Sequence, residues 1–211
     1  MIKDLQKKYE MRRGEIKKRL EEFSQVKNKP DELLFAELAF CLCTPQSKAT
    51  TCWNAIDSLV RNNLLYTGDK NQLKPFLNAI RFNANKASYI TQARALFSDG
   101  NRLNLKKFIG SLNSPYEMRE WLVENVNGMG MKEASHFLRN IGIGSGLAIL
   151  DTHILKNLNK YGVIEGLPKS LSKKQYLEIE KRMKNFAEQI EIPFDELDLL
   201  LWSEETGFIF K

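Results

Sequence analysis

The chain has 211 residues, of which 43% are hydrophobic, so it is long enough to form one large globular domain or two small ones. Its 32 Lys and Arg residues against 26 Asp and Glu give a formal net charge of +6, which permits an acidic partner such as nucleic acid without requiring one. Residues 33–43 form the longest apolar run, which includes Glu37 and falls short of the ~20 residues that span a bilayer. With no apolar segment behind Met1, we expect a cytoplasmic protein without a membrane span or a secretory signal.

Apolar residues recur at intervals of three and four, without the sustained alternation of a strand, so the sequence predicts an all-α fold. A charged first segment carries one apolar face and breaks at residues 28–30. The next segment, residues 31–43, is apolar nearly all round and predicts a buried central helix. The same periodicity predicts further helices over residues 46–63, 72–80, 84–97 and 104–112.

The cysteines, Cys41, Cys43 and Cys52, lie close together on segments predicted to be helical. An odd number of closely spaced cysteines favours reduced, buried thiols over a disulfide framework. An iron–sulfur cluster held by protein thiolates needs four cysteines, and only His136 and His153 are present to complete a zinc site. We therefore expect no metal site.

A helix–hairpin–helix is predicted between residues 114 and 142. Ser114 and Pro115 mark a helix start, with Glu117 placed to complete a capping box. A second amphipathic helix follows Gly128 and Gly130 and stops at Gly142. Two later helix starts are predicted, capped by Asp151 and by Ser172, and a last helix follows Pro193. The apolar tail, residues 207–211, is expected to dock against the protein.

The hairpin predicts a contact with phosphate. Glycines at 128 and 130 let the backbone turn tightly, which leaves amide groups pointing outward at a helix start. Such amides, together with the helix dipole, bind a DNA phosphate without reading the base sequence. Gly128, Gly130, His136 and Arg139 are therefore candidate DNA contacts, the last two because they share a helix face with Lys132.

Lys132 and Asp151 are the candidate catalytic residues. Lys132 is either a solvated surface lysine or a nucleophile, and a cation in the first turn of a helix opposes the dipole, which favours the uncharged amine that a nucleophile needs. Asp151 is either a plain helix cap or a carboxylate that stabilises positive charge on a sugar; one side chain can serve both roles.

Residues 128–132 together with residues 150–154 resemble the signature of the helix–hairpin–helix DNA glycosylase superfamily. In that superfamily a lysine and an aspartate at this spacing form the catalytic pair. The resemblance extends over nearly the whole chain, because residues 43–47 match the loop that probes or fills the DNA stack, which makes Gln46 the candidate wedge. Without a four-cysteine cluster, the short chain and its terminal residues 200–211 look like the archaeal-type 8-oxoguanine DNA glycosylase/AP lyase.

The resemblance implies further site residues. Lys211 would distinguish 8-oxoguanine from guanine, or else be a disordered terminal residue. Trp202 would line the base pocket, or else only pack in the core. Because 8-oxoguanine differs from guanine by an N7–H donor, an acceptor is needed as well, and we expect a backbone carbonyl in the bend at residues 29–31, around Pro30, to supply it.

The resemblance also implies how the protein is organised and what it does. We expect a barrel-like helical domain over residues 31–145 and a second helical domain formed by residues 1–30 and 146–211. The protein would act as a monomer on double-stranded DNA, in the cytoplasm and at the nucleoid, without a cofactor. It would release the base through Lys132 and nick the strand by β-elimination. Two alternatives stay open: a glycosylase for another damaged base, and a non-catalytic helix–hairpin–helix module that binds DNA.

Overall fold

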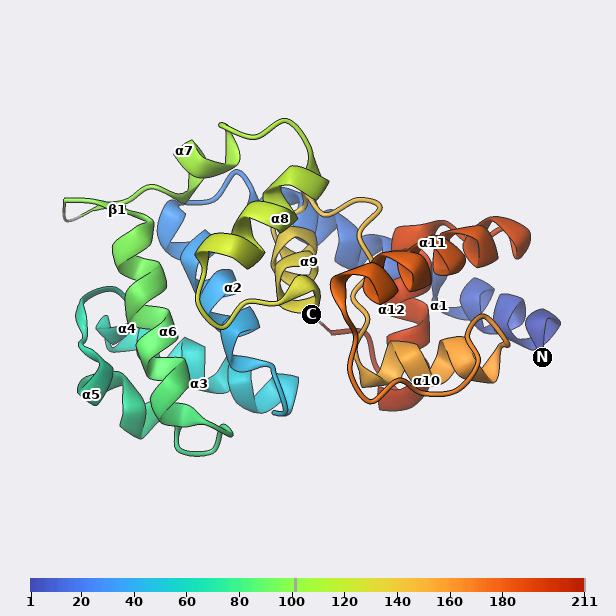
Figure 1. The fold of residues 1–211 in the computed structure, drawn as a ribbon, viewed down its shortest axis with the longest axis horizontal. Helices are drawn as coiled ribbons and strands as arrows, with labels where there is room; N and C mark the ends of the chain where they lie inside the picture. The colour runs from blue at the N-terminus through green and yellow to red at the C-terminus, as the bar shows by residue number, and fades with distance from the viewer. Residues whose placement is uncertain (101, 211) are drawn as a thin grey trace.

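The computed structural model describes residues 1–100 and 102–210, and in this part of the chain the predicted all-α class is confirmed (Figure 1). Its elements are α1 (Ile2–Val26), α2 (Asp31–Cys43), α3 (Ala49–Arg61), α4 (Leu64–Thr67), α5 (Lys70–Leu73), the 3₁₀ helix η1 (Lys74–Leu77), α6 (Asn83–Leu96), α7 (Leu105–Ile109), α8 (Pro115–Asn125), α9 (Met131–Asn140), α10 (Thr152–Lys160), α11 (Lys173–Gln189) and α12 (Phe194–Thr206). Two short strands, β1 (Ser98–Asp99) and β2 (Arg102–Leu103), pair antiparallel.

Some helix limits differ from the prediction for local reasons. The helix predicted over 46–63 begins only at Ala49, because residues 44–47 form a loop in which Gln46 has a left-handed backbone, with φ at 55°. The helix predicted over 72–80 is instead divided into α5 and η1. Pro75 lies at the start of η1, where its missing N–H breaks the α-helical bonding.

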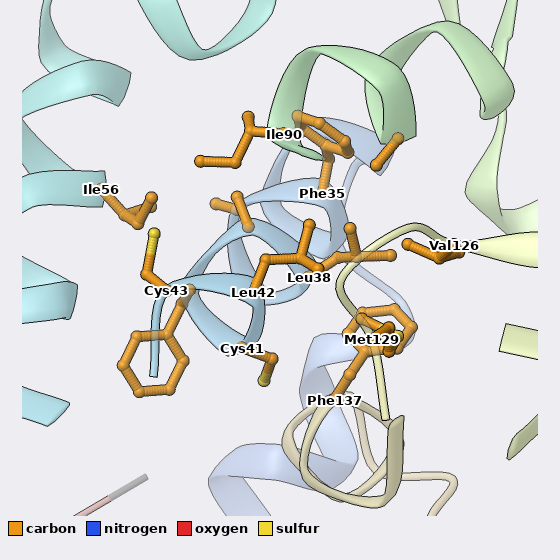
Figure 2. Packing of buried hydrophobic residues seen from close by; sticks show 14 of the residues in the cluster. Phe35, Leu38, Cys41, Leu42, Cys43, Ile56, Ile90, Val126, Met129 and Phe137 are labelled. Carbon is orange, nitrogen blue, oxygen red and sulfur yellow. The ribbon is translucent and has the colours of Figure 1, made fainter. Parts of the chain in front are cut away.

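Helix α2 is the centre of the larger core, as its apolar sequence predicts. Its side chains from Leu34 to Cys43 are all buried. Figure 2 shows Cys43 beside Ile56 of α3 and Phe35 beside Ile90 of α6. Because the buried part of α2 is packed on all sides, the position at which the following loop begins is fixed by the core.

Two hydrophobic cores share the molecule. The larger one contains buried residues from Leu34 to Leu147, and the smaller one combines residues 5–23 with residues 148–201. In Figure 1 the helices of the smaller core, α1, α10, α11 and α12, lie together, with α8 and α9 between them and the other helices. The change from one core to the other falls at Leu147 and Ala148, next to the predicted domain boundary; whether the two parts are separate domains stays a prediction.

Buried ion pairs join these two parts. Both guanidinium Nη atoms of Arg119, in α8, donate to the Glu180 carboxylate of α11, at 2.6 and 3.1 Å. Glu180 also accepts the backbone N–H of Ala148 at 2.7 Å. In the second pair, Arg139 of α9 donates to Asp198 of α12 at 2.8 Å. The cavity described below therefore lies between parts that charged side chains hold together.

The predicted state of the cysteines is confirmed, and the predicted docking of the tail is confirmed for residues 207–210. The three cysteines are buried and free, and burial raises the pKa of the Cys52 thiol to about 11. The tail returns along α1, where Arg12 donates to the Gly207 carbonyl at 2.9 Å and Arg19 donates to the Phe210 carbonyl at 3.1 Å. No helix in the described ranges has the length and apolar character to cross a membrane.

Candidate active site

The helix–hairpin–helix forms as predicted, from α8, a short turn and α9. The Ser114 hydroxyl accepts the Glu117 N–H at 3.2 Å and so caps α8. Gly128 has φ at 82°, and a Cβ there would overlap the ring of Tyr89, so this position requires glycine. Gly130 has an ordinary extended backbone, and its N–H donates to the Glu133 carboxylate at 3.2 Å. Only the first glycine is thus needed to make the turn.

A cavity of about 820 Å³ opens beside the start of α9. Its walls come from four segments and one further side chain: residues 44–49, 130–136, 150–155 and 168–176, and Trp202, each contributing some or all of its residues. This volume lies in the range that binds a small organic group, such as a base with its sugar. Among the described residues, no group of three or more His, Cys, Asp or Glu side chains could hold a metal ion.

Lys132 lies in the wall of this cavity and is not a solvated surface lysine. It is the second residue of α9, and its side chain is 20% exposed. Its Nζ donates to the Thr44 hydroxyl at 3.0 Å and lies 3.6 Å from a carboxylate oxygen of Glu133. The Thr44 hydroxyl in turn donates to the Cys41 carbonyl at 2.9 Å. The lysine amine is therefore held in one place at the cavity surface.

Asp151 lines the same cavity and also caps a helix, as the sequence suggested. Its Oδ1 accepts the backbone N–H groups of His153 and Ile154, both at 2.9 Å. This cap uses one carboxylate oxygen and leaves Oδ2 for another partner. The segment before Asp151 is fixed by Tyr176, whose Oη donates to the Ala148 carbonyl at 2.6 Å.

Three helix N-termini meet at the cavity. The residues that precede α3, α9 and α10, which are Lys48, Gly130 and Asp151, all line it. Helix N-termini attract anions through their dipoles and their free N–H groups. Carboxylates already accept N–H groups at the starts of α9 and α10, whereas α3 has no acidic residue in its first turn. Lys48 and Lys169 add positive charge to the same walls. Lys48, Lys169 and the start of α3 are thus the parts of the cavity wall best suited to phosphate groups.

Three other predicted residues also line the cavity. Gln46 is exposed, in the loop after α2. The Trp202 ring stands edge-on to His153, with centroids 6.2 Å apart, while Trp202 also packs against the smaller core. His136 is 5% exposed and packs edge-on to the ring of Phe40, so it lies in the wall and not on an outer surface.

Three of the predicted residues do not line the cavity: Gly128, which shapes the turn before α9, and also Arg139 and Pro30. The Arg139 side chain is 10% exposed and pairs with Asp198, so its charge is already neutralised inside the protein. Pro30 is exposed ahead of α2, and its carbonyl accepts the N–H groups of Leu33 and Leu34 in the first turn of that helix. In this structure Arg139 is held in a buried ion pair and Pro30 caps α2, so their predicted contacts with DNA and with the base stay predictions. The predicted base-recognition residue Lys211 lies outside the described residues.

Sequence reasoning did not find Thr44, Glu133 or Tyr176. Glu133 follows Gly130 by three residues, the spacing of a capping pair, and could have been found from that local pattern. Thr44 and Tyr176 act through contacts with residues far away in the chain, and no local pattern marks such contacts.

A helix–hairpin–helix whose second helix presents a lysine to a cavity that a helix-capping aspartate also lines is the arrangement of the class of helix–hairpin–helix DNA glycosylases. Residues 16–192 match the family Ogg-HhH, which is described as 8-oxoguanine DNA glycosylase. The matched region spans most of the sequence. The chain belongs to the 8-oxoguanine DNA glycosylase family.

Relatives and solved structures agree over the full length. A protein of Fusobacterium nucleatum named 8-oxoguanine DNA glycosylase/AP lyase is 46% identical over 209 residues, which cover 99% of this chain and 96% of that protein. The crystal structure of Methanocaldococcus jannaschii 8-oxoguanine DNA glycosylase superposes with a TM-score of 0.88 at 35% identity, covering 100% and 95% of the two chains. The structure of the M. jannaschii glycosylase/lyase with 15-mer DNA containing 8-oxoguanine gives 0.87 at 35% identity, covering 97% and 98%.

Proposed function

We propose that this protein excises 8-oxoguanine from double-stranded DNA and then nicks the resulting abasic site. The observation that carries the proposal is that the amine of Lys132 and the carboxylate of Asp151 line one cavity large enough for a nucleoside. Membership of the 8-oxoguanine DNA glycosylase family supports the choice of lesion.

DNA binding would begin at the cavity entrance. The N-terminus of α3, with Lys48 and Lys169, attracts the phosphate backbone. The exposed Gln46 fills or probes the stack as the damaged nucleotide turns out of the duplex, at a cost of a few kcal/mol. The extruded base then stacks on Trp202. The active form in this proposal is a monomer.

The chemistry assigns one role to each side chain. Lys132, as an uncharged amine, attacks C1′ of the sugar; the bond from C1′ to the base breaks, and its electron pair leaves with the base. Asp151 stabilises the positive charge that develops on the sugar ring. Of the two protons on the attached nitrogen, one goes to the departing base and the other to O4′ as the C1′–O4′ bond breaks, which leaves a Schiff base between Lys132 and C1′. Loss of a proton from C2′ breaks the C3′–O bond and nicks the strand.

Borohydride trapping tests this proposal. The wild-type protein is expected to form a covalent adduct with duplex DNA containing 8-oxoguanine, because borohydride reduces the Schiff base. Lys132→Gln should form none, since it has no amine. Lys156→Gln is the control, because it removes an exposed cation of α10 that does not line the cavity, and it should keep the adduct.

The outcomes separate this proposal from its alternatives. An adduct with Lys132→Gln at the wild-type level would contradict the role of Lys132. DNA binding by the wild-type protein with no adduct would indicate a non-catalytic module. Adduct formation with DNA containing oxidised pyrimidines or alkylated purines, but not 8-oxoguanine, would indicate a glycosylase for another lesion.

A further inference from the structure

Lys86 of α6 is a buried lysine outside the proposed chemistry. The residue is only 3% exposed. Its Nζ donates to the Cys43 carbonyl at 2.6 Å, the Pro45 carbonyl at 2.8 Å and the Ser47 hydroxyl at 3.1 Å. A protonated lysine has three N–H donors, and these three acceptors use all of them. A buried charge is tolerated where it is satisfied in this way.

All three acceptors belong to residues 43–47, which are the last residue of α2 and the loop that follows it. This loop carries Gln46, whose φ of 55° is uncommon for a residue other than glycine and costs about 1–3 kcal/mol. Contacts from outside must therefore hold the loop in this conformation. Ser47 extends the same network, because its hydroxyl also accepts the N–H of Arg81 at 3.1 Å.

The loop also carries Thr44, the partner of Lys132. The Thr44 hydroxyl donates its only proton to the Cys41 carbonyl, so it can meet the lysine amine only as an acceptor. An uncharged amine has two N–H groups and one lone pair. With one N–H directed at Thr44, the lone pair stays free to attack carbon.

We propose that Lys86 is a positioning residue for the reaction proposed above: its ammonium group fixes the 43–47 loop, so that Thr44 orients the amine of Lys132. This inference rests on the proposed function, because it assigns Lys86 a part in the attack of that amine. Lys86 does not touch the substrate. It acts through Thr44, and through the same loop it also sets the direction of Gln46.

The test is the rate of borohydride-trapped adduct formation on pre-formed abasic DNA, under single-turnover conditions with saturating protein, so that DNA affinity does not enter. Lys86→Met should lower this rate by roughly 10–100-fold, since small misplacements of reacting groups have effects of that size. Arg94→Met is the matched control. Arg94 is also an α6 cation that donates to backbone carbonyls, those of Leu65 at 2.9 Å and Gly68 at 2.6 Å at the end of α4, and it does not line the cavity. The rate of Arg94→Met should stay within about twofold of wild type, although its loss of thermal stability should be similar to that of Lys86→Met.

A double-mutant cycle with Thr44→Val tests the route of the effect. Thr44→Val alone should slow adduct formation, and Lys86→Met should add much less in that background than in the wild type. The Thr44→Val rate also keeps the proposal testable if Lys86→Met does not fold. A wild-type rate for either single variant, or an equal loss from Lys86→Met in both backgrounds, would overturn the inference. Absence of any adduct with the wild-type protein would instead remove the proposed function itself.

Discussion

Asp151 shows at the scale of one residue how a structural and a chemical role share a side chain. Its Oδ1 is used by the backbone N–H groups of His153 and Ile154, which fixes the carboxylate at the cavity wall. The cap thus also fixes the position of the other oxygen, Oδ2, which takes no part in the cap itself. Lys132 is fixed in a similar way, by Thr44 on one side and the start of α9 on the other.

Replacing Asp151 by Asn should separate these two roles. Asn caps a helix as well as Asp does, so the thermal midpoint should change little. The negative charge is lost, and we expect base excision to slow by about 100- to 1,000-fold, as when one electrostatic group is removed from an active site. Single-turnover excision of 8-oxoguanine and a thermal melt measure the two effects.

Asp151→Ala provides the comparison, because it removes the cap as well as the charge. It should lose about 1 kcal/mol of stability in addition to the activity. If Asp151→Asn excised the base at the wild-type rate, the carboxylate would be a helix cap alone.

At the scale of elements, the turn between α8 and α9 depends on Gly128 much more than on Gly130. Gly128 has a left-handed backbone and lies against the ring of Tyr89, whereas Gly130 is extended and has only the flexible Glu133 carboxylate nearby. The conformation of the hairpin therefore requires glycine at position 128 but does not require it at position 130.

Gly128→Ala should destabilise the protein by roughly 2–4 kcal/mol, through the left-handed backbone and the overlap with Tyr89. Gly130→Ala should cost less than about 1 kcal/mol, because an extended backbone accepts any residue. Urea denaturation of both variants measures the difference. Equal destabilisation by the two changes would contradict this assignment of the turn.

Elements were predictable from the sequence where the signal is local. Ser114, Asp151 and Ser172 all cap the helices predicted to start after them, because a cap needs only the next three residues. The bond from Lys132 to Thr44 joins residues 88 positions apart, and no local pattern encodes it. Helical periodicity places Arg139 on the same face of its helix as Lys132. The Arg139 side chain nevertheless pairs with Asp198, a carboxylate that α12 supplies. The sequence motif thus predicts the catalytic candidates Lys132 and Asp151, whereas only the fold reveals a partner such as Thr44.

At the scale of the whole molecule, the cavity lies where two hydrophobic cores meet, and buried charge pairs hold that junction. Arg119 with Glu180 and Arg139 with Asp198 each connect a helix of the hairpin to a helix of the smaller core. The tail makes a third connection, because Ile209 packs against one core and Phe210 against the other. A change in one of these pairs should therefore alter the stability of the whole chain.

The pH dependence of stability tests the Arg139–Asp198 pair. Burial raises the pKa of Asp198 to about 6, although Arg139 opposes this shift. An acid whose pKa is higher in the folded state stabilises that state fully only below its unfolded pKa of about 4, and this stabilisation is lost as the pH rises through 6. Asn at position 198 does not titrate. From pH 4 to pH 7 the unfolding free energy of the wild type should thus fall by about 2–3 kcal/mol relative to Asp198→Asn.

Urea denaturation at several pH values measures this difference. The absolute stability of Asp198→Asn should be lower, since Arg139 stays buried without its partner, so only the change with pH is diagnostic. Parallel pH profiles for the two proteins would contradict a raised pKa for Asp198.

The central claim, that the amine of Lys132 is the nucleophile, is tested most directly by locating the covalent bond in the unaltered protein. The wild-type enzyme would be incubated with duplex DNA containing 8-oxoguanine, reduced with borohydride, digested with nuclease and protease, and analysed by mass spectrometry. We predict one modified peptide, with the sugar remnant on Lys132. A remnant on another residue, such as Lys169 or the N-terminal amine, would contradict the claim.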